Sequence, residues 1–494
     1  MPARRRTIKR RVRSLGGKVI RRFNLLPNGT PDRLGDDDAL LDRTLRGDVV
    51  VFFPDTGDSL YQLRGWLGPL AELHRTRGVT IVCMDSRVAH AVAAETTVPV
   101  VTIGRDDTLD RLVAAGGVKL MLYVNYNPLN FIALRLRSVV HVSLLHGDSD
   151  KTVSVSNQIK AYDYSFVAGQ AAIDRLTRFT AFFDAAERCI PVGRPALDTD
   201  RAAVAERRAE SGAEGEPGPT DAAAHPGPGI RPSAGTRAGT GARPRTVLYA
   251  PTWEGAHAAV SYSSLISHGD GLVRALIAAG HRVIYRPHPL TGVRLGAYGE
   301  ADAEIRRRVE AAGQRVSVGT ALAADFAAAD LVICDVSAVA IDWLATGKPF
   351  IVTEPAGGTA RDAPTRLLSV VPRLPVAAVA EAARLVAREL DDDPGRADRL
   401  ALREYYLGDT RPGASLERFL SACERLCELR DREWRRISRN ETSPSVDHGG
   451  PAAASASPPG AATGATTRAT AASGPAAASD EPAPVSARRE NKNV

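Results

Sequence analysis

The sequence predicts an α/β protein with two similar domains, each built on a parallel sheet. Short, continuously apolar runs rich in β-formers recur along the chain, with about 10 to 20 residues of helix-like sequence between them. The pattern occurs twice, on either side of a segment dominated by Gly, Pro and Ala. Continuous apolar runs at this spacing indicate strands buried on both faces and joined by crossover helices. We therefore expect two Rossmann-like domains that face each other.

Each expected strand corresponds to one apolar run. In the first domain the runs cover residues 48–54, 79–85, 98–104, 118–124, 139–145 and 164–169. In the second domain they cover residues 246–251, 282–287, 330–335 and 349–354. A chain of 494 residues with 44% hydrophobic content can build a core around each sheet.

Composition sets the expected domain boundaries. Residues 211–244 and the end of the chain are so rich in Gly, Pro and Ala that they cannot bury enough apolar surface to offset their chain entropy. The expected organisation is a basic arm at 1–24, an N-terminal domain at 45–205, a disordered linker at 206–244, a C-terminal domain at 245–438 and a disordered tail at 439–494.

The formal net charge of +7 is concentrated at the start of the chain. Residues 1–22 hold ten Lys and Arg and no acidic residue. An Arg-rich, amphipathic start suits anionic lipid headgroups, whereas nucleic-acid binding would call for aromatic or zinc-binding signatures that do not accompany it. A solvated tail is the alternative. Without a secretory h-region or a run of about 18 apolar residues, we expect a cytoplasmic protein at the inner face of the membrane.

The five cysteines predict neither disulfides nor a metal site. They are odd in number and scattered, mostly within apolar runs. Cys423 and Cys427 share one helical face, but no His or second Cys pair accompanies them, so we interpret them as buried packing residues. No ligand cluster calls for a metal cofactor, although a divalent ion is not excluded.

Ligands of open α/β sheets bind beyond the carboxyl ends of the strands. Four such ends carry polar residues: "LLHGDSDK" (144–151), "LYAPTWEG" (248–255), "YRPHP" (285–289) and "ICDVSAVAIDWLATGKP" (333–349). A histidine after a strand is often structural. The joint placement of these four segments favours a binding site.

The first segment supplies a candidate base and a candidate anion contact. His146 titrates near neutral pH and can take a proton from an alcohol nucleophile. Gly147 allows a tight turn and close approach of a substrate, and Lys151 can contact an anionic substrate. The alternative for Lys151 is a solvated surface side chain.

The second and third segments supply further candidates for binding phosphate. Arg286 offers a guanidinium fork for phosphate oxygens, and a protonated His288 could neutralise charge on a phosphoryl group. Thr252 and Trp253 contribute a hydroxyl and an indole, the latter bordering a base or filling the wall.

In the fourth segment, Asp335 closes a strand and Ser337 begins a helix that also carries Asp342. A serine at this position caps the helix, and the amides beside it can bind an anion. Simple capping is the alternative. Four familiar patterns are missing, namely GxxxxGK[ST], GxSxG, HExxH and GxGxxG after a first strand, which argues against P-loop hydrolysis, serine hydrolysis, zincin chemistry and ordinary dinucleotide binding.

These segments together resemble the CDP-glycerol glycerophosphotransferase family, which builds teichoic-acid-type poly(glycerol phosphate) and has a GT-B fold. The resemblance spans roughly residues 139–410 without the linker and rests on "HGDSDK", "LYAPTW", "RPHP" and "ADLVICDVSAVAIDWLATGKPFI". It implies transfer of glycerol phosphate from CDP-glycerol to a hydroxyl of a polymer or lipid-linked acceptor, with release of CMP.

The resemblance also implies roles for individual residues. His146 would be the base, Arg286 and His288 would hold the donor diphosphate, and Ser337 would bind phosphate near Asp335. The family usually has D-Y-S-S where this chain has Asp-Val-Ser-Ala, so Ala338 removes one hydroxyl. Spacing leaves open which histidine is the base.

Two other functions remain open at the sequence level. A GT-B glycosyltransferase that uses a nucleotide sugar would need the same fold and phosphate-binding helix. A degenerate partner that binds a polymer would fit Ala338 but not the intact histidines.

Overall fold

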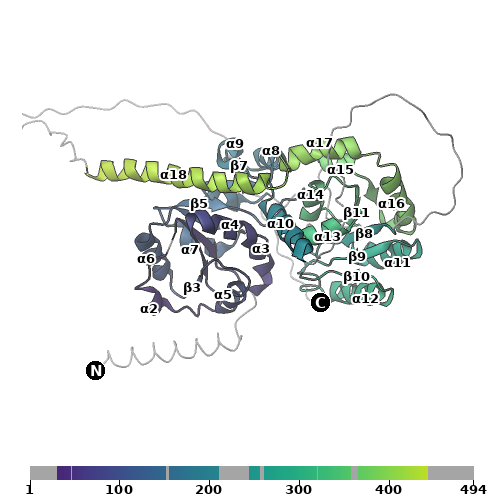
Figure 1. The fold of residues 1–494 in the computed structure, drawn as a ribbon, viewed down its shortest axis with the longest axis horizontal. Helices are drawn as coiled ribbons and strands as arrows, with labels where there is room; N and C mark the ends of the chain where they lie inside the picture. The colour runs from purple at the N-terminus through teal and green to yellow at the C-terminus, as the bar shows by residue number, and fades with distance from the viewer. Residues whose placement is uncertain are drawn as a thin grey trace, which may run out of the picture. The chain divides into compact units, whose positions relative to one another are not determined.

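Two fully parallel β-sheets form the framework of the protein, as predicted (Figure 1). The structure is a computed structural model that describes residues 30–45, 47–151, 155–210, 244–255, 261–319, 321–357 and 365–442. The basic arm and the segments 211–243 and 443–494 lie outside the described residues. Residues 206–210, predicted to start the linker, are the end of a helix.

The N-terminal sheet has seven strands in the order β3-β2-β1-β4-β5-β6-β7. Their bounds are β1 Val49–Phe53, β2 Val79–Cys83, β3 Val100–Thr102, β4 Leu120–Tyr123, β5 Val140–Ser143, β6 Tyr164–Val167 and β7 Cys189–Pro191. The first six match the predicted runs. β7 escaped prediction because it has three residues, of which only Cys189 is buried.

Helices cover both faces of this sheet. In chain order they are α2 Asp37–Leu40, η1 Gly57–Ser59, α3 Leu60–Arg64, α4 Leu67–Arg77, α5 Ser86–Ala93, α6 Asp106–Gly116, η2 Pro128–Asn130, α7 Phe131–Leu134, η4 Asn157–Ala161, α8 Gln170–Phe179, α9 Ala185–Arg188 and α10 Pro195–Glu210. Helices α3, α4 and α5 pack on one face, and α2, α6 and α7 pack on the other.

The C-terminal sheet has six strands in the order β10-β9-β8-β11-β12-β13. Their bounds are β8 Thr246–Ala250, β9 Arg282–Tyr285, β10 Arg315–Val316, β11 Leu331–Cys334, β12 Phe350–Thr353 and β13 Arg373–Leu374. The four longer strands are the predicted ones. β10 and β13 are two residues long, too short to give a recognisable apolar run.

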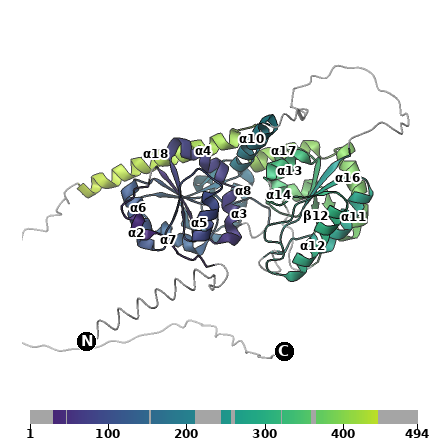
Figure 2. The same cartoon turned by 60° about the horizontal axis from the view of Figure 1, so that its bottom comes forward.

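Helices also enclose the C-terminal sheet (Figure 2). They are η6 Leu265–Gly269, α11 Asp270–Ala278, α12 Gly296–Ala311, α13 Leu322–Ala328, α14 Ala338–Leu344, α15 Arg366–Val370, η7 Val376–Glu381, α16 Ala382–Asp391 and α17 Arg396–Leu407. The last helix of the chain, α18 Ala414–Thr442, packs on the N-terminal sheet instead. Helices α13, α14 and α17 share one core cluster, and α11, α12 and α16 share the other.

The long helix α18 returns to the N-terminal half of the chain (Figure 1). Its apolar residues recur every three or four positions, which places them on one face. Phe419, Cys423 and Cys427 are buried in the core of the N-terminal sheet. The two cysteines are unpaired packing residues, in agreement with the sequence interpretation.

Strand register determines where the site can form. In the C-terminal sheet, Ala250 pairs with Cys334 and Tyr249 pairs with Tyr285, so β8, β9 and β11 end at nearly the same level. The strand order reverses between β8 and β11: β9 and β10 lie on one side of β8, and β11, β12 and β13 lie on the other. Open α/β sheets bind ligands at such a reversal. The described residues up to Asn440, including both sheets, form one compact unit.

Candidate active site

A cavity of about 500 Å³ lies at these strand ends and is lined by both halves of the chain. Its size suits one ligand of nucleotide dimensions. Among the sequence-predicted residues, those that line it are His146, Gly147, Lys151, Thr252, Trp253, Arg286, His288, Ser337 and Asp342. Asp335 is the predicted residue that does not line it. Residues that follow different strands, up to nearly 200 positions apart in the sequence, therefore line one cavity.

The turn that presents His146 is strained and closely packed. Leu145 has a φ of 55°, a left-handed conformation that is uncommon for a leucine. Its carbonyl accepts a hydrogen bond from the Trp66 indole at 2.7 Å. At Gly147, an added Cβ would lie 2.9 Å from the Cβ of Ala338, so this glycine serves the close approach of α14. Strain of this kind is typical of functional sites.

Tyr61 stands between the two histidines. Its ring makes edge contacts with His146, at 5.9 Å between centroids, and with His288, at 5.5 Å. Trp253 stacks on His288 at 6.2 Å with an interplanar angle of 20°. Trp253 therefore acts as a wall that orients an imidazole. The two histidines face one aromatic ring and can act on one substrate.

The hydrogen bonds of His288 identify its tautomer. The amide of Leu290 donates to His288 Nδ1 at 3.1 Å, so Nδ1 carries no proton. A neutral His288 must then carry its proton on Nε2. In that form the ring donates a hydrogen bond from Nε2 and has no basic nitrogen left to accept a proton.

Both imidazoles are neutral at physiological pH in the empty cavity. More than a third of His146 is exposed, because it opens into the cavity. Surrounding protein, Arg194 and Lys151 nevertheless lower its pKa to about 4. Burial, Lys151 and His146 lower the pKa of His288 to about 3. The lowered pKa favours a neutral His288, which offers an N–H donor in place of a positive charge.

Lys151 supplies positive charge at the same place. Its Nζ donates to Thr252 Oγ1 at 3.2 Å and lies 5.5 Å from the centroid of the Tyr262 ring. Burial lowers the pKa of Lys151 to about 8, an effect that Asp335 opposes. The ammonium group is therefore mostly protonated at pH 7. This contact also joins the first predicted segment to the second.

Arg286 is fixed by an ion pair below the cavity. Its Nη1 donates to Asp325 Oδ2 at 2.6 Å, and Ser317 Oγ donates to the same carboxylate oxygen at 2.6 Å. Asp325 is fully buried. A guanidinium held in this way is preorganised for an oxyanion and loses little conformational entropy on binding.

Ser337 lines the cavity, whereas Asp335 does not. Ser337 holds the N-cap position of α14, but its Oγ makes no capping bond and, within the described residues, has no hydrogen-bond partner. The Asp335 carboxylate is fully buried, accepts from the amides of Thr252 and Ser264 and accepts from Thr353 Oγ1 at 2.5 Å. Asp335 thus holds the β8 turn in place, and Ser337 is a lining residue of the cavity whose Oγ is buried.

Asp342 faces a cation from the other half of the chain. Arg194 Nε donates to Asp342 Oδ1 at 2.6 Å, and its Nη2 donates to Oδ2 at 3.2 Å. The same Nη2 donates to the carbonyl of His146 at 3.4 Å. Burial raises the pKa of Asp342, which Arg194 opposes. The pair links α14 to the turn that presents His146.

Sequence analysis missed Tyr61 and Arg194. Both follow strands, Tyr61 after β1 and Arg194 after β7. The strand-end argument would have included Arg194 had β7 been recognised. Tyr61 lies on α3, beyond the turn at the end of β1.

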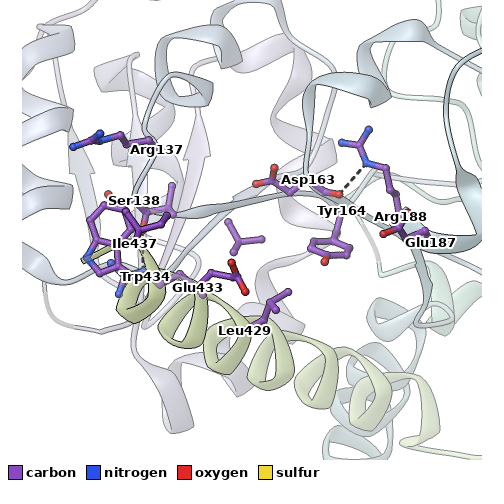
Figure 3. A pocket seen from close by; sticks show the side chains of 13 residues that line it. Arg137, Ser138, Asp163, Tyr164, Glu187, Arg188, Leu429, Glu433, Trp434 and Ile437 are labelled. Carbon is purple, nitrogen blue, oxygen red and sulfur yellow. Dashed lines mark hydrogen bonds between the residues drawn. The ribbon is translucent and has the colours of Figure 1, made fainter. Parts of the chain in front are cut away.

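A separate cleft of about 380 Å³ lies between α18 and the beginnings of β5 and β6 (Figure 3). Trp434, Ile437 and Leu429 of α18 line one side. On the other side Arg188 Nε donates to the carbonyl of Asp163 at 3.2 Å. None of the sequence-predicted site residues lines this cleft.

The described residues include neither a metal-binding cluster nor a membrane-spanning helix. No group of three or more His, Cys, Asp or Glu side chains is placed there to hold a metal ion. No described helix is both long and apolar enough to cross a membrane.

Fold and site define a GT-B protein with a cavity between two parallel-sheet halves. Residues 230–397 match the family model of CDP-glycerol:poly(glycerophosphate) glycerophosphotransferase. This match confirms the resemblance over residues 230–397 and supports a transferase of the glycerophosphotransferase type. No curated protein matches the chain.

Solved structures that resemble this chain are distant in sequence. A variant of the wall teichoic acid polymerase TagF is 14% identical, covers 88% of this chain and 98% of its own, and has a TM-score of 0.50. Another TagF structure, also 14% identical with coverages of 88% and 98%, gives 0.46. A putative UDP-N-acetylglucosamine 2-epimerase from Listeria monocytogenes, 13% identical with coverages of 77% and 96%, also gives 0.46.

Proposed function

We propose that this protein transfers glycerol phosphate, or a related polyol phosphate, from a CDP-activated donor to a hydroxyl of a teichoic-acid-type acceptor and releases CMP. The observation that carries the proposal is the gathering of His146, His288 and Lys151 in one cavity. The half that matches the glycerophosphotransferase family contributes His288, Arg286 and Ser337 to that cavity. Phosphoryl transfer requires mainly positioning and charge stabilisation, which such groups provide.

His146 is the general base in this proposal. Its imidazole is neutral and takes the proton of the acceptor hydroxyl, while the hydroxyl oxygen forms a bond to the phosphorus that carries glycerol. The bond from that phosphorus to the bridging oxygen breaks, and CMP leaves with the electron pair. The tautomer of His288 favours this assignment, because its Nδ1 already accepts from Leu290.

The remaining groups stabilise the oxygens that gain charge. His288 Nε2–H donates to a phosphoryl oxygen, and Lys151 and Arg286 offset the charge of the diphosphate. Ser337 Oγ is a further donor. Ala338 cannot contribute a second hydroxyl, and its methyl group instead contacts Gly147. The wall at α14 therefore makes one side-chain hydroxyl contact to phosphate.

The proposed roles predict an unusual dependence of kcat/KM on pH. Since His146 must be neutral and its pKa is about 4, kcat/KM should stay level down to about pH 5 instead of falling near 6.5. Lys151, with a pKa of about 8, should lose its charge above pH 8, so kcat/KM for the donor should fall there. Initial rates at limiting donor between pH 5 and 10 measure both limbs.

A Lys151→Arg variant is the control for the alkaline limb. An arginine stays charged throughout this range, so the decline above pH 8 should disappear in the variant. An acid limb near pH 6.5, or an alkaline limb unchanged in Lys151→Arg, would contradict the assigned roles.

A donor panel tests the proposed function against its main rival. We expect CDP-glycerol or CDP-ribitol to bind and to yield CMP in the presence of acceptor, and UDP-sugars to be inert. Isothermal titration gives donor affinity, and chromatography gives CMP. Turnover confined to UDP-sugars would make the protein a glycosyltransferase, and inactivity with every donor would favour a polymer-binding partner.

The basic arm suits a place at the inner face of the cell membrane. Residues 1–22 hold ten Lys and Arg, and each basic residue near an anionic surface contributes about 1 kcal/mol. We propose that the arm holds the cytoplasmic enzyme close to a lipid-linked acceptor.

A further inference from the structure

A second cavity of about 350 Å³ adjoins the active-site cavity. Lys151 and Arg175 line both cavities, so the two meet at these side chains. Helix α8 provides one wall of the second cavity, and the first residue of α15 and the end of α17 provide another. We call it the side cavity. No role assigned so far uses it.

The deep end of the side cavity is a closed polar network. Arg175 makes ion pairs with Asp148 and with Asp150, the latter at 3.2 Å. The Tyr406 hydroxyl donates to Asp150 Oδ2 at 2.7 Å. Both carboxylates are buried. Arg175 thus offsets one of these two negative charges. Asp150 and Asp174 are the carboxylates that line the side cavity, and its four lining cations, Lys151, Arg175, Arg178 and Arg366, outnumber them.

Two exposed arginines stand among the lining residues. The Arg366 guanidinium lies 4.3 Å from the centroid of the Tyr405 ring, and that of Arg178 lies 5.1 Å from the centroid of the Phe179 ring. Within the described residues, neither arginine forms an ion pair. Guanidinium groups held over aromatic rings retain their hydrogen-bond donors for phosphate oxygens.

The acceptor needs room of its own. The active-site cavity has the volume for one nucleotide-sized ligand, which the donor fills. An acceptor that enters past Lys151 meets His146, which lies five positions earlier on the same loop. The side cavity joins the active-site cavity at that lysine.

We propose that the side cavity is the subsite for the polyol-phosphate acceptor of the proposed reaction. Arg178 and Arg366 hold its phosphodiesters, and its terminal hydroxyl reaches His146 past Lys151. This inference rests on the proposed function and specifies the acceptor subsite of the same reaction. Each unit of a poly(glycerophosphate) chain, the polymer in the name of the matching family, carries one negative charge that a guanidinium group can bind.

Binding of a soluble oligo(glycerol phosphate) of about six units tests the proposal without any turnover. We expect the Arg178→Gln/Arg366→Gln double variant to raise its Kd at least about tenfold, since hydrogen bonds to charged groups are lost. The Kd of CDP-glycerol should stay within about twofold of the wild-type value. With both substrates present, the acceptor KM should rise while kcat at saturating acceptor is kept.

The matched control is Arg111→Gln/Arg384→Gln, which removes two exposed arginines outside both cavities. Oligomer binding that falls equally in both double variants would reveal only a general charge effect and would overturn the side-cavity proposal. Unchanged binding in Arg178→Gln/Arg366→Gln would overturn it as well. Failure of the wild type to bind CDP-glycerol would instead refute the proposed function, while the oligomer titration would still decide about the side cavity.

Discussion

A His146→Gln substitution is expected to lower kcat for polyol-phosphate transfer by roughly 10²- to 10⁴-fold, the range typical for loss of a general base. Donor affinity should change little, because neutral His146 contributes no charge to the diphosphate. Initial rates and a donor titration on the same protein separate the two quantities. The expected signature is a fall in kcat with an almost constant donor Kd.

Two further histidine variants make the experiment specific. His288→Gln should weaken donor binding and transfer together, because its Nε2–H is assigned to phosphoryl oxygens. His90→Gln alters an exposed histidine away from the cavity and should leave both quantities unchanged. A His146→Gln enzyme with normal kcat, or one whose only defect is donor binding, would contradict the assignment of His146 as base.

Asp342→Ala is expected to lower the free energy of unfolding by roughly 3–5 kcal/mol, because it leaves the Arg194 guanidinium buried without its partner. Both side chains are largely buried, with exposures of 5% for Asp342 and 14% for Arg194. The change also removes the carboxylate that holds Arg194 Nη2, the group that donates a hydrogen bond to the His146 carbonyl. Urea unfolding followed by circular dichroism measures the loss.

An exposed ion pair provides the control for this second prediction. Glu381→Ala removes the partner of Arg384, at 3.4 Å and mostly exposed, and should cost less than about 1 kcal/mol. The Arg194→Met/Asp342→Leu double variant should recover much of the stability lost in Asp342→Ala, because no charge remains buried. Equal stability of Asp342→Ala and Glu381→Ala would show that the pair contributes no more than a surface contact.

The strands that could be predicted from the sequence are those whose side chains are buried on both faces of the sheet. β8 and β11 are continuous apolar runs because helices cover both faces of their sheet. Such runs can be recognised in the sequence alone. β10 and β13 make only two paired positions each, so no run of apolar residues marks them. Helix α18 is visible as an amphipathic pattern, but the pattern does not reveal that Phe419 packs on the sheet of the other half.

The site was predictable where chemistry sits directly after a strand, as at His146, Thr252, Arg286 and Ser337. The direction in which each of these side chains points could not be predicted from the sequence. Asp335 follows its strand in the same way, yet its carboxylate turns toward buried amides and away from the cavity. The tautomer of His288 depends on one backbone amide two positions later, which only coordinates reveal.

Coupled measurement of both products is the most direct test of the proposed transfer reaction. Purified protein is incubated with CDP-glycerol labelled in the glycerol and with oligo(glycerol phosphate) acceptor. The account predicts one CMP released for each labelled unit added to the acceptor, with both products lost in His146→Gln. CMP release without incorporation, or incorporation of sugar from a UDP-sugar in its place, would contradict it.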